Sequence, residues 1–573
     1  MLPMLEIKDL TIEFPSTNRT VRAVSSLSLR LNKGETLGIV GESGSGKSVT
    51  ALSVMRLLPA TGKIASGEIL YQSSTQPSES KTNLLALPPS ELPKFRGAEI
   101  AMIFQEPMTS LNPVFRCGEQ VTESIRLHQK VSTREAEERA MQWLERVRLP
   151  DTKRIFQSFP HQLSGGQKQR VMIAMAMSCQ PSILLADEPT TALDVTVQKA
   201  ILELMRELKE EHRLSMLFIS HDLGVVAEIC DRVAVMSQGN IVEEGPVKQV
   251  LTSPAHPYTK GLVACRPSLH RQLHRMPTIS DFFEKKHHEA RVVSASDTAA
   301  RRAALYAQEP LLKIKNLLVR YPASKNWRGE PNTWLHAVDD VSFDVFPGET
   351  FGLAGESGCG KTTLGKALAR LTDAHAGSVA WNNTDLLALA PEAFQPYRRE
   401  IQVVFQDPYA SLNPRLTVGE AIVEPMRVHR LHQDEKTRRE KAMALLETVG
   451  LQAEHFGRYP REFSGGQRQR VCVARALAVE PKVLVCDEIV SSLDVSVQAT
   501  VLNLLLDLRE QLGLTYLFIS HDLSVVKQMC DRLLVMRAGK TEALGFPEDI
   551  YERPESAYLR QLIAAFPQSF IRE

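Results

Sequence analysis

The chain repeats itself over hundreds of residues, and this repeat limits the folds that it can adopt. Four strings recur in the same order: GESGSGKS (41–48) and GESGCGKT (355–362), FQEPMTSLNP (104–113) and FQDPYASLNP (405–414), LSGGQKQRV (163–171) and FSGGQRQRV (463–471), and LFISHDL (217–223 and 517–523). Ser164 and Ser464, like His221 and His521, are 300 residues apart. Solenoid repeats recur every roughly 20–50 residues. The repeat therefore predicts a duplicated domain.

The composition of the 573 residues is that of an ordinary globular protein with sizeable cores. Hydrophobic residues make up 43% of the chain, charged residues make up 24%, and the net charge is +1. A nucleic-acid binder would carry a strongly basic face, so we expect no nucleic-acid partner. No segment has the roughly 20 apolar residues of a membrane span, and the first residues lack the pattern of a secretory leader. We therefore expect the chain to work in the cytoplasm.

Eight cysteines are scattered along the chain, and no two of them form a CxxC pair. This spacing argues against a disulfide framework and against a zinc ribbon. We expect most of these cysteines to be reduced thiols in the cores.

The repeat and the residues between its copies predict four segments. Residues 1–253 form the first copy, 254–310 an extension and linker, 311–552 the second copy, and 553–573 a C-terminal tail helix. The centre of 254–310 is charged and lacks a sustained apolar pattern, so we expect a linker with a single helix. His287 and His288 have no other candidate metal ligands around them and are interpreted as a solvated pair. The polar stretch 71–83 lengthens the first copy and is interpreted as a surface loop.

In each copy a glycine-rich loop lies between an apolar strand and a helix. The first copy predicts a strand over 37–40 and a helix after Gly46, which is the setting in which G-x-x-x-x-G-K-[ST] binds phosphate. Glycines let backbone N–H groups surround phosphate oxygens, while Lys47 reaches the β- and γ-phosphates and Ser48 ligates Mg²⁺. The second copy has the same order after a strand over 350–354. The predicted phosphate-binding residues are Gly41, Gly44, Gly46, Lys47, Ser48, Gly355, Gly358, Gly360, Lys361 and Thr362.

Each copy also has an apolar strand that ends in two carboxylates, in ILLADEP and VLVCDEI. Asp187 is placed to hold Mg²⁺ through water, and Glu188 to accept a proton from attacking water. Asp487 and Glu488 repeat the pair. An acidic pair at a strand end is by itself typical of a helix cap or a solvated turn. The glycine loop in the same copy favours the catalytic interpretation.

A histidine follows the next apolar strand in each copy and precedes an aspartate. A single histidine is more often structural. His221 and His521 lie in identical strings after the acidic strand, which favours a γ-phosphate contact and a role in orienting water. The predicted catalytic residues are Glu188, His221, Glu488 and His521.

The string SGGQ, followed by a basic QRV helix and placed between the glycine loop and the acidic strand, resembles the signature of ABC-type ATPases. The resemblance covers both copies. It implies an α/β fold of two tandem ABC-type nucleotide-binding domains, each a RecA-like P-loop core with an antiparallel β subdomain and an α-helical subdomain. The implied cofactors are ATP and Mg²⁺.

The resemblance further implies that the two domains close head to tail over two ATP molecules, so that each signature contacts the γ-phosphate held by the other domain. One ATP would be shared by Lys47, Asp187, Glu188 and His221 with Ser464, Gly465, Gly466 and Gln467. The other would be shared by Lys361, Asp487, Glu488 and His521 with Ser164, Gly165, Gly166 and Gln167. The small residues of SGG let backbone N–H groups at a helix start approach the anion.

Gln105 and Gln406 match the Q-loop glutamines of the family, which touch Mg²⁺ and sense the transmembrane partner. The implied metal ligands, some of them through water, are Ser48, Gln105, Asp187, Thr362, Gln406 and Asp487. Both sites look complete, so we expect hydrolysis at both.

Asp194 and Asp494 match the D-loop of the family. Phe14 and Tyr321 fall where an aromatic ring stacks on adenine, although core aromatics also fit these positions.

Two strings resemble the branch of the family that imports oligopeptides, dipeptides and nickel: FQ[ED]P..SLNP in both copies, and SPAHPYTKGLV at 253–263. The second copy has RPESAYLRQLI at 553–563, which keeps the proline and the tyrosine but not the histidine. The fusion of two ATPase domains is similar to the ATPases of glutathione and peptide importers. Some members of the branch carry an iron–sulfur cluster, which needs four ligands, and only Cys265 lies in that region. We expect no such cluster.

The branch implies two transmembrane permease subunits and an extracytoplasmic substrate-binding protein as partners, with the chain on the cytoplasmic face of the inner membrane. One alternative is a cytosolic ABC-F-type translation factor, but Pro267 and Pro277 interrupt the long charged helix that such factors carry between domains. A nickel or metal-chelate importer ATPase is a second alternative. A DNA-repair ABC ATPase would need zinc-binding cysteine pairs, and an exporter is disfavoured by the importer strings.

Overall fold

The computed structural model describes residues 3–15, 20–73, 81–105, 110–191, 193–284, 291–325, 331–491 and 493–566. The chain folds into two compact units. The first takes in Met1–Ala264 and Ile279–Lys286, and the second takes in Cys265–Thr278 and His287–Phe566. The expected solvated pair His287 and His288 and most of the expected loop 71–83 lie outside the described residues.

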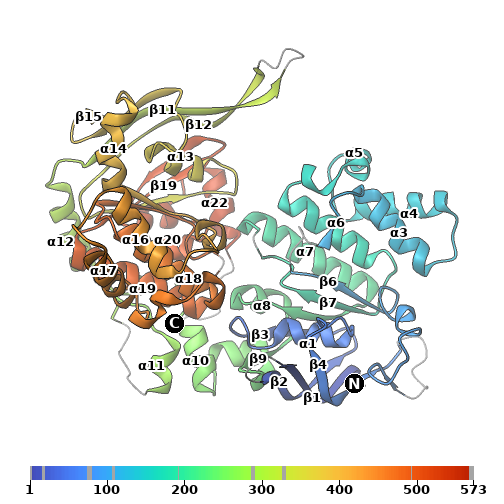
Figure 1. The fold of residues 1–573 in the computed structure, drawn as a ribbon. Coiled ribbons are helices and arrows are strands. Elements are labelled where there is room, and N and C mark those ends of the chain that lie inside the picture. The colour runs from blue at the N-terminus through green and yellow to red at the C-terminus, as the bar shows by residue number, and fades with distance from the viewer. Residues whose placement is uncertain are drawn as a thin grey trace. The chain divides into compact units, whose positions relative to one another are not determined.

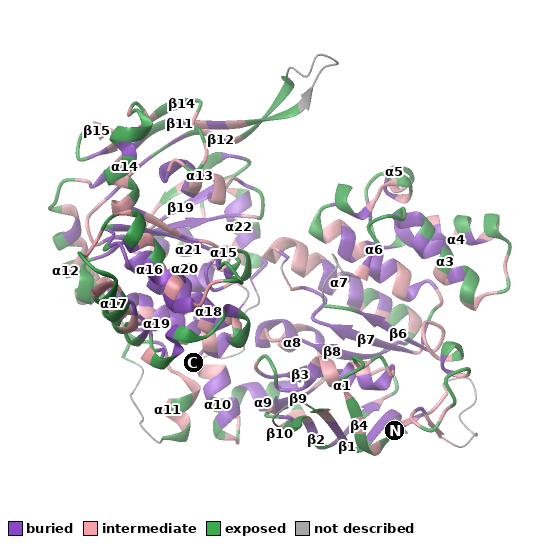
Figure 2. Cartoon of the chain, viewed as in Figure 1, coloured by how far each residue is buried: buried purple, intermediate pink, exposed green. Residues whose placement is uncertain are grey.

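The first unit is built on a six-stranded sheet in the order β10-β9-β3-β8-β7-β6. Its strands are β3 (Thr36–Val40), β6 (Ile100–Ile103), β7 (Ile183–Asp187), β8 (Ser215–Ile219), β9 (Arg232–Ser237) and β10 (Asn240–Pro246). All but β10 are parallel to their neighbours. Every residue of β3, β7 and β8 is buried, as Figure 2 shows, because helices cover both faces of a parallel sheet. The continuous apolar runs of these strands follow from that burial.

A four-stranded antiparallel sheet, in the order β2-β1-β4-β5, lies beside this core. It consists of β1 (Pro3–Pro15), β2 (Thr20–Asn32), β4 (Lys63–Tyr71) and β5 (Thr82–Asn83). The helices of the first unit are α1 (Lys47–Val54), α3 (Cys117–His128), α4 (Thr133–Arg146), α5 (Thr152–Gln157), α6 (Gly165–Met177), α7 (Val195–His212), α8 (Leu223–Ile229), α9 (Val247–Thr252), α10 (Pro257–Ala264) and α11 (Ile279–Phe283). Helices α3 to α6 pack on one another as a helical subdomain (Figure 1).

The second unit repeats this arrangement. Its parallel core, in the order β16-β17-β18-β13-β19-β20, consists of β13 (Thr350–Ala354), β16 (Ile401–Val404), β17 (Val483–Asp487), β18 (Thr515–Ile519), β19 (Arg532–Arg537) and an antiparallel edge strand β20 (Lys540–Gly545). Its antiparallel sheet consists of β11 (Leu312–Lys325), β12 (Pro331–Val345), β14 (Ala376–Trp381) and β15 (Thr384–Asp385). Its helices are α12 (Ala295–Tyr306), α13 (Lys361–Leu368), α14 (Pro391–Glu400), α15 (Pro408–Ser411), α16 (Val418–Val428), α17 (Glu435–Thr448), α18 (Gly465–Leu477), α19 (Val495–Leu512), α20 (Leu523–Met529), α21 (Pro547–Glu552) and α22 (Ala557–Ala564).

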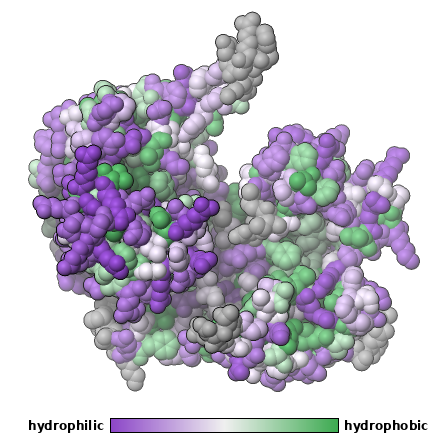
Figure 3. Space-filling view, in the orientation of Figure 1, coloured by the Kyte–Doolittle hydropathy of each residue, from purple (hydrophilic) through white to green (hydrophobic). Residues whose placement is uncertain are grey.

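Helices α16, α17 and α18 pack together as the helical subdomain of the second unit. Its surface is strongly hydrophilic around α17 (Figure 3). This helix buries only Ala442 and Leu446 of its side chains. Polar residues on the outward side of a helix keep it solvated while its apolar stripe packs inward.

The two units confirm the predicted α/β class and the tandem arrangement of domains. The expected strands over 37–40 and 350–354 are β3, which starts one residue earlier, and β13. All eight cysteines are free, and six of them are buried. Among the described residues, no helix is both long and apolar enough to cross a bilayer.

The expected linker 254–310 contains more structure than its charged sequence indicates. It holds three helices, α10, α11 and α12, of which α10 and α11 pack together in the first unit. Cys265–Thr278 and α12 pack in the second unit, where Leu273 and Met276 are buried. Two isolated apolar residues form no periodic pattern, which is why the sequence did not indicate this docking.

Candidate active sites

The glycine loop of the first unit joins the end of β3 to the start of α1. Gly46 has φ 103°, and a Cβ atom there would collide with the backbone oxygen of Ala23, so only glycine fits. Lys47 is buried, and its Nζ donates to the backbone oxygens of Gly41 at 2.7 Å and Glu42 at 2.8 Å. The loop therefore folds around the ammonium group, as a phosphate-binding loop requires.

The carboxylate at the end of β7 lies against the start of α1. The Ser48 hydroxyl donates to Asp187 Oδ1 at 2.9 Å. Burial and the neighbouring charge of Glu188 raise the pKa of Asp187 to about 6, although the Ser48 hydrogen bond opposes them. A hydroxyl and a carboxylate are the hard oxygen ligands that Mg²⁺ takes, so this pair fits the predicted metal site.

Glu188 is the next residue, and its backbone is left-handed with φ 49°. This conformation is uncommon for a residue with a side chain and costs about 1–3 kcal/mol. The backbone N–H donates to the Ile219 oxygen of the neighbouring strand at 2.9 Å, which holds the residue in place. Left-handed residues held by their surroundings cluster at active sites.

Three side chains converge on the Glu188 carboxylate. Its Oε2 accepts from Gln105 Nε2 at 3.1 Å and from the Thr191 hydroxyl at 2.9 Å, and it lies 3.2 Å from His221 Nδ1. Burial raises the pKa of Glu188, but the hydrogen bond and charge of His221 outweigh burial and hold the pKa at about 2. The structure thus brings the predicted base, histidine and Q-loop glutamine together.

The second unit has the same constellation. Lys361 Nζ donates to the oxygens of Gly355 at 2.8 Å and Glu356 at 2.9 Å, and the Thr362 hydroxyl donates to Asp487 at 2.8 Å. Glu488, with φ 49°, accepts from Gln406 Nε2 at 2.9 Å and lies 3.2 Å from His521 Nδ1. Burial raises the pKa of Asp487, while His521 lowers the pKa of Glu488 against the effect of burial.

The two sites differ in one hydroxyl. Thr191 donates to the carboxylate of Glu188, whereas Ser491 donates to the backbone oxygen of Glu488. The sequences DEPTT and DEIVS therefore leave the second carboxylate with one hydrogen bond fewer among those described.

The signature residues begin α6 and α18. Ser164 and Ser464 cap these helices, since each hydroxyl accepts from the backbone N–H of the glutamine three residues later. A Cβ at Gly166 would lie 2.6 Å from Val197 Cγ1, so a larger residue would push α6 away from α7. The predicted signature residues Gly165, Gly166 and Gln167, and Gly465, Gly466 and Gln467, thus form the first turn of each helix.

The predicted D-loop residues and adenine-stacking residues differ between the two units more than the catalytic residues do. Asp194 caps α7 through Val197 N–H, and Asp494 is the residue before α19. Phe14 packs on Gly62 at the margin of the core, while Tyr321 is 40% exposed on β11. Tyr321 is therefore more open to a ligand than Phe14.

A contact to the glycine loops was missed at the sequence level. The Glu42 N–H donates to the Tyr258 hydroxyl at 3.1 Å, and the Glu356 N–H donates to the Tyr558 hydroxyl at 3.3 Å. Both tyrosines are buried, on α10 and α22. Their recurrence at the 300-residue offset, in the strings that mark the importer branch, was the available signal.

We expect Tyr258→Phe and Tyr558→Phe to weaken ATP binding at the loop that each residue supports. Each hydrogen bond lost costs about 0.5–1.5 kcal/mol, so losing the bond to the loop N–H corresponds to a roughly 2- to 12-fold higher dissociation constant. Equilibrium binding of a fluorescent ATP analogue measures the change. A dissociation constant equal to that of the unmodified chain would show that the tyrosines do not hold the loops.

Comparison with known families agrees with this geometry. Residues 24–191 and 338–491, more than half of the chain, match the model of the family described as ABC transporter. The chain belongs to the ABC transporter ATPase family. Residues 242–287 of this ABC ATPase also match the family described as oligopeptide/dipeptide transporter, C-terminal region. The match includes α10 and Tyr258.

Curated relatives of this ABC ATPase extend over nearly its whole length. It is 48% identical over 570 residues to the glutathione import ATP-binding protein GsiA of Salmonella choleraesuis, covering 98% of this chain and 89% of the relative. It is 47% identical over 573 residues to the protein of that name from Pectobacterium atrosepticum, covering 99% and 90%. A solved structure, the dimeric post-hydrolysis state of the ATP-binding cassette MJ0796 bound to ADP and Pi, is 29% identical with a TM-score of 0.38 and covers 43% of this chain and 99% of that chain. The ABC ATPase thus falls in the oligopeptide/dipeptide branch and hydrolyses ATP, and the translation-factor alternative is not favoured.

Proposed function

We propose that this ABC ATPase powers the import of glutathione or a related short peptide. The observation that carries the proposal is its near full-length similarity to glutathione import ATP-binding proteins. The match of 242–287 to the oligopeptide/dipeptide family supports the same substrate class. Both glycine loops, both carboxylate pairs and both histidines are present, as an energy-supplying subunit needs.

Each glycine loop binds the phosphates of one ATP in this proposal. Lys47 and Lys361 exchange their bonds to loop oxygens for the β- and γ-phosphates. The oxygens of Ser48 with Asp187, and of Thr362 with Asp487, would hold Mg²⁺, which neutralises phosphate charge when it is bound. To bind Mg²⁺, Asp187 must be ionised. Burial raises the pKa of Asp187 in the free chain, and a bound divalent cation would stabilise the ionised form and lower this pKa again.

Glu188 and Glu488 act as proton acceptors for the attacking water. A carboxylate with a pKa of about 2 is a weak base while His221 donates to it. We infer that the γ-phosphate draws His221 away from Glu188, so that the carboxylate regains basicity only when ATP is in place. His521 and Glu488 have the same 3.2 Å pairing and would act in the same way.

The family resemblance extends the proposal to composite sites. Ser464, Gly465, Gly466 and Gln467 would complete the site of Lys47, and Ser164, Gly165, Gly166 and Gln167 the site of Lys361. Small residues at the first turn of α6 and α18 leave backbone N–H groups open to an anion, which supports this role. ATP binding would then favour closed domains, and hydrolysis would release them.

Two transmembrane permease subunits and an extracytoplasmic binding protein are the proposed partners, with the ABC ATPase bound peripherally to the inner membrane. Exposed apolar side chains follow the Q-loop glutamines in the sequence, which supports the proposal that a protein partner binds there. Val114 is 71% exposed and Phe115 51% exposed in the first unit, and Tyr409 is 66% exposed in the second. Isolated exposed apolar residues are common, but these follow the residues that contact Glu188 and Glu488.

The proposal is tested by purifying the ABC ATPase with the permeases encoded beside it and measuring ATP hydrolysis and uptake in vesicles. Labelled glutathione, dipeptides and nickel chelates are compared in the presence of the binding protein. We expect glutathione or a dipeptide to stimulate hydrolysis and to accumulate. Uptake of a nickel chelate alone, or co-purification with ribosomes without permeases, would overturn the proposal.

A further inference from the structure

The stretch Gln272–Met276, which we call the strap, lies on the second unit through two side-chain amides. Gln528 on α20 accepts from the Leu273 N–H at 3.0 Å and donates to the Leu273 oxygen at 2.6 Å. Asn503 on α19 accepts from the Met276 N–H and donates to the Met276 oxygen, both at 2.8 Å. Each amide thus satisfies both peptide groups of one strap residue. Gln528 and Asn503 are almost fully buried, with exposures of 1% and 3%.

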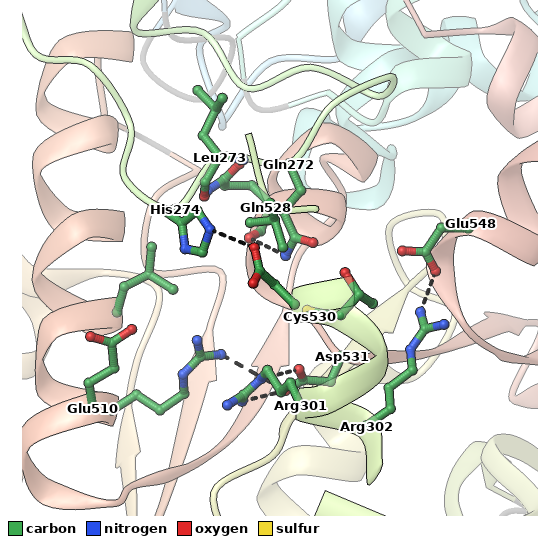
Figure 4. Close-up of a pocket in the computed structure, with 15 residues that line it drawn as sticks. Gln272, Leu273, His274, Arg301, Arg302, Glu510, Gln528, Cys530, Asp531 and Glu548 are labelled. Atoms are coloured by element: carbon green, nitrogen blue, oxygen red, sulfur yellow. Dashed lines mark hydrogen bonds and ion pairs between the residues drawn. The ribbon is translucent and has the colours of Figure 1, made fainter. Parts of the chain in front are cut away.

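The strap is also paired with the segment before α12. Leu273 forms an antiparallel bridge with Val292, and the His274 N–H donates to the Arg291 oxygen at 3.0 Å. Helix α12 then contributes Arg301, which binds both oxygens of Asp531 at 2.6 and 2.9 Å. Figure 4 shows Leu273, His274, Arg301 and Asp531 among the residues that line a cavity of about 190 Å³. Asp531 in turn accepts from the first N–H of β13, the strand that leads into the glycine loop.

The first unit has no such covering among its described residues, and its sequence differs at the matching positions. At the 300-residue offset, Asn503 and Gln528 correspond to Glu203 and Glu228. The Arg206 side chain donates to the backbone oxygen of Glu228 at 2.9 Å, whereas the backbone oxygen of Gln528 accepts from the side chain of strap residue Gln272 at 3.0 Å. The second unit thus has neutral amides at the two positions that bind the strap, whereas the first unit has carboxylates there.

A second exchange occurs at the aspartate that anchors the glycine-loop strand. Asp231 of the first unit accepts from Lys209 of its own α7 at 2.8 Å. In the second unit the equivalent Arg509 lies 3.9 Å from Asp531, and Arg301 of α12 takes the close position instead. Arg301, which lies in the linker, thus makes the ion pair with Asp531 that Lys209 of α7 makes with Asp231 in the first unit.

The strap binds α19 and α20, the two helices that follow Glu488 and His521 in the sequence. Helix α19 begins after Asp494, and α20 begins two residues after His521. We propose that the strap, through Asn503 and Gln528, is a positioning element of the second ATP site: it holds α19 and α20 so that His521 is placed to move from Glu488 to the γ-phosphate. This inference rests on the role proposed above for His521.

Carboxylates at positions 503 and 528 cannot donate to the strap oxygens, so Asn503→Glu with Gln528→Glu restores the first-unit residues and releases the strap. Hydrogen exchange is followed in peptides covering 270–277 and 520–530, together with the kcat and KM of ATP hydrolysis. We expect exchange in both peptides to accelerate by about tenfold or more. In a Glu188→Gln background, in which the second site carries the hydrolysis, we expect kcat to fall by about threefold or more with KM within about twofold, because His521 is misplaced while the glycine loop is untouched.

A matched control and a strap-side variant separate positioning from folding. Glu203→Asn with Glu228→Gln makes the reverse exchange in the first unit and should leave kcat within about twofold, because no strap is held there. Leu273→Ser with Met276→Ser loosens the strap without altering α19 or α20, so it tests the proposal if the glutamate variant does not fold. Fast exchange of 270–277 in the unmodified chain, or a released strap with unchanged kcat, overturns the proposal. His521→Ala is measured alongside: if it leaves kcat unchanged, the role assigned to His521 fails whatever the strap does.

Discussion

Replacing both glutamates, as Glu188→Gln with Glu488→Gln, should lower the kcat of ATP hydrolysis by about 10²–10⁴-fold while ATP still binds. Glutamine keeps the shape of the side chain and can still accept hydrogen bonds from Gln105 and His221, but it cannot take a proton from water. The contacts that hold each glutamate in its left-handed conformation involve the backbone and are unchanged. Phosphate release in the steady state measures kcat, and equilibrium dialysis measures ATP binding.

The single substitutions Glu188→Gln and Glu488→Gln test whether both sites hydrolyse ATP. Both glutamates have the same backbone conformation and the same histidine distance, so we expect each single change to lower activity. Glu210→Gln and Glu510→Gln are matched controls, since both residues are exposed and lie at the 300-residue offset. Normal activity of Glu188→Gln beside an inactive Glu488→Gln would contradict hydrolysis at both sites.

Replacing the loop lysines should abolish ATP binding at the site concerned. Lys47→Ala or Lys361→Ala removes a buried ammonium group that makes two hydrogen bonds to its loop in the free chain. Charge-assisted hydrogen bonds contribute about 1.5–3 kcal/mol each, so losing the pair to the β- and γ-phosphates weakens ATP binding by on the order of 10²-fold or more. Isothermal titration with a non-hydrolysed ATP analogue reports the loss as a missing binding site.

The ammonium group of Lys47 also binds the backbone of its own loop, so the variant is compared with a control for folding. Lys33→Ala removes an exposed lysine from the same unit and should leave binding unchanged. Thermal unfolding of each variant shows whether the loop change spreads to the core. Full binding stoichiometry in a folded Lys47→Ala protein would exclude this loop as a nucleotide site.

The repeat and the motif spacing were enough to predict two α/β domains, their glycine loops and the carboxylate pairs at the strand ends. These features are local, because phosphate binding needs particular residues at fixed distances along one strand, loop and helix. Thr350–Ala354 was predicted to the residue, since a fully buried parallel strand must be a short apolar run. The small residues of SGG indicated a helix start in each copy, and the structure begins α6 at Gly165 and α18 at Gly465, each after a serine cap.

Only the tertiary structure decided how distant residues meet. The left-handed backbone of Glu188 and the convergence of Gln105, Thr191 and His221 on its carboxylate depend on neighbouring strand ends. Tyr258 reaches Glu42 across 216 residues, and the strap reaches Gln528 across 255. Such contacts join single polar groups over long loops and leave no periodic pattern in the sequence. The phosphate-binding residues can therefore be recognised in the sequence, because they are close together along the chain. The contacts that hold them in position join residues that are far apart in the sequence, so only the tertiary structure shows them.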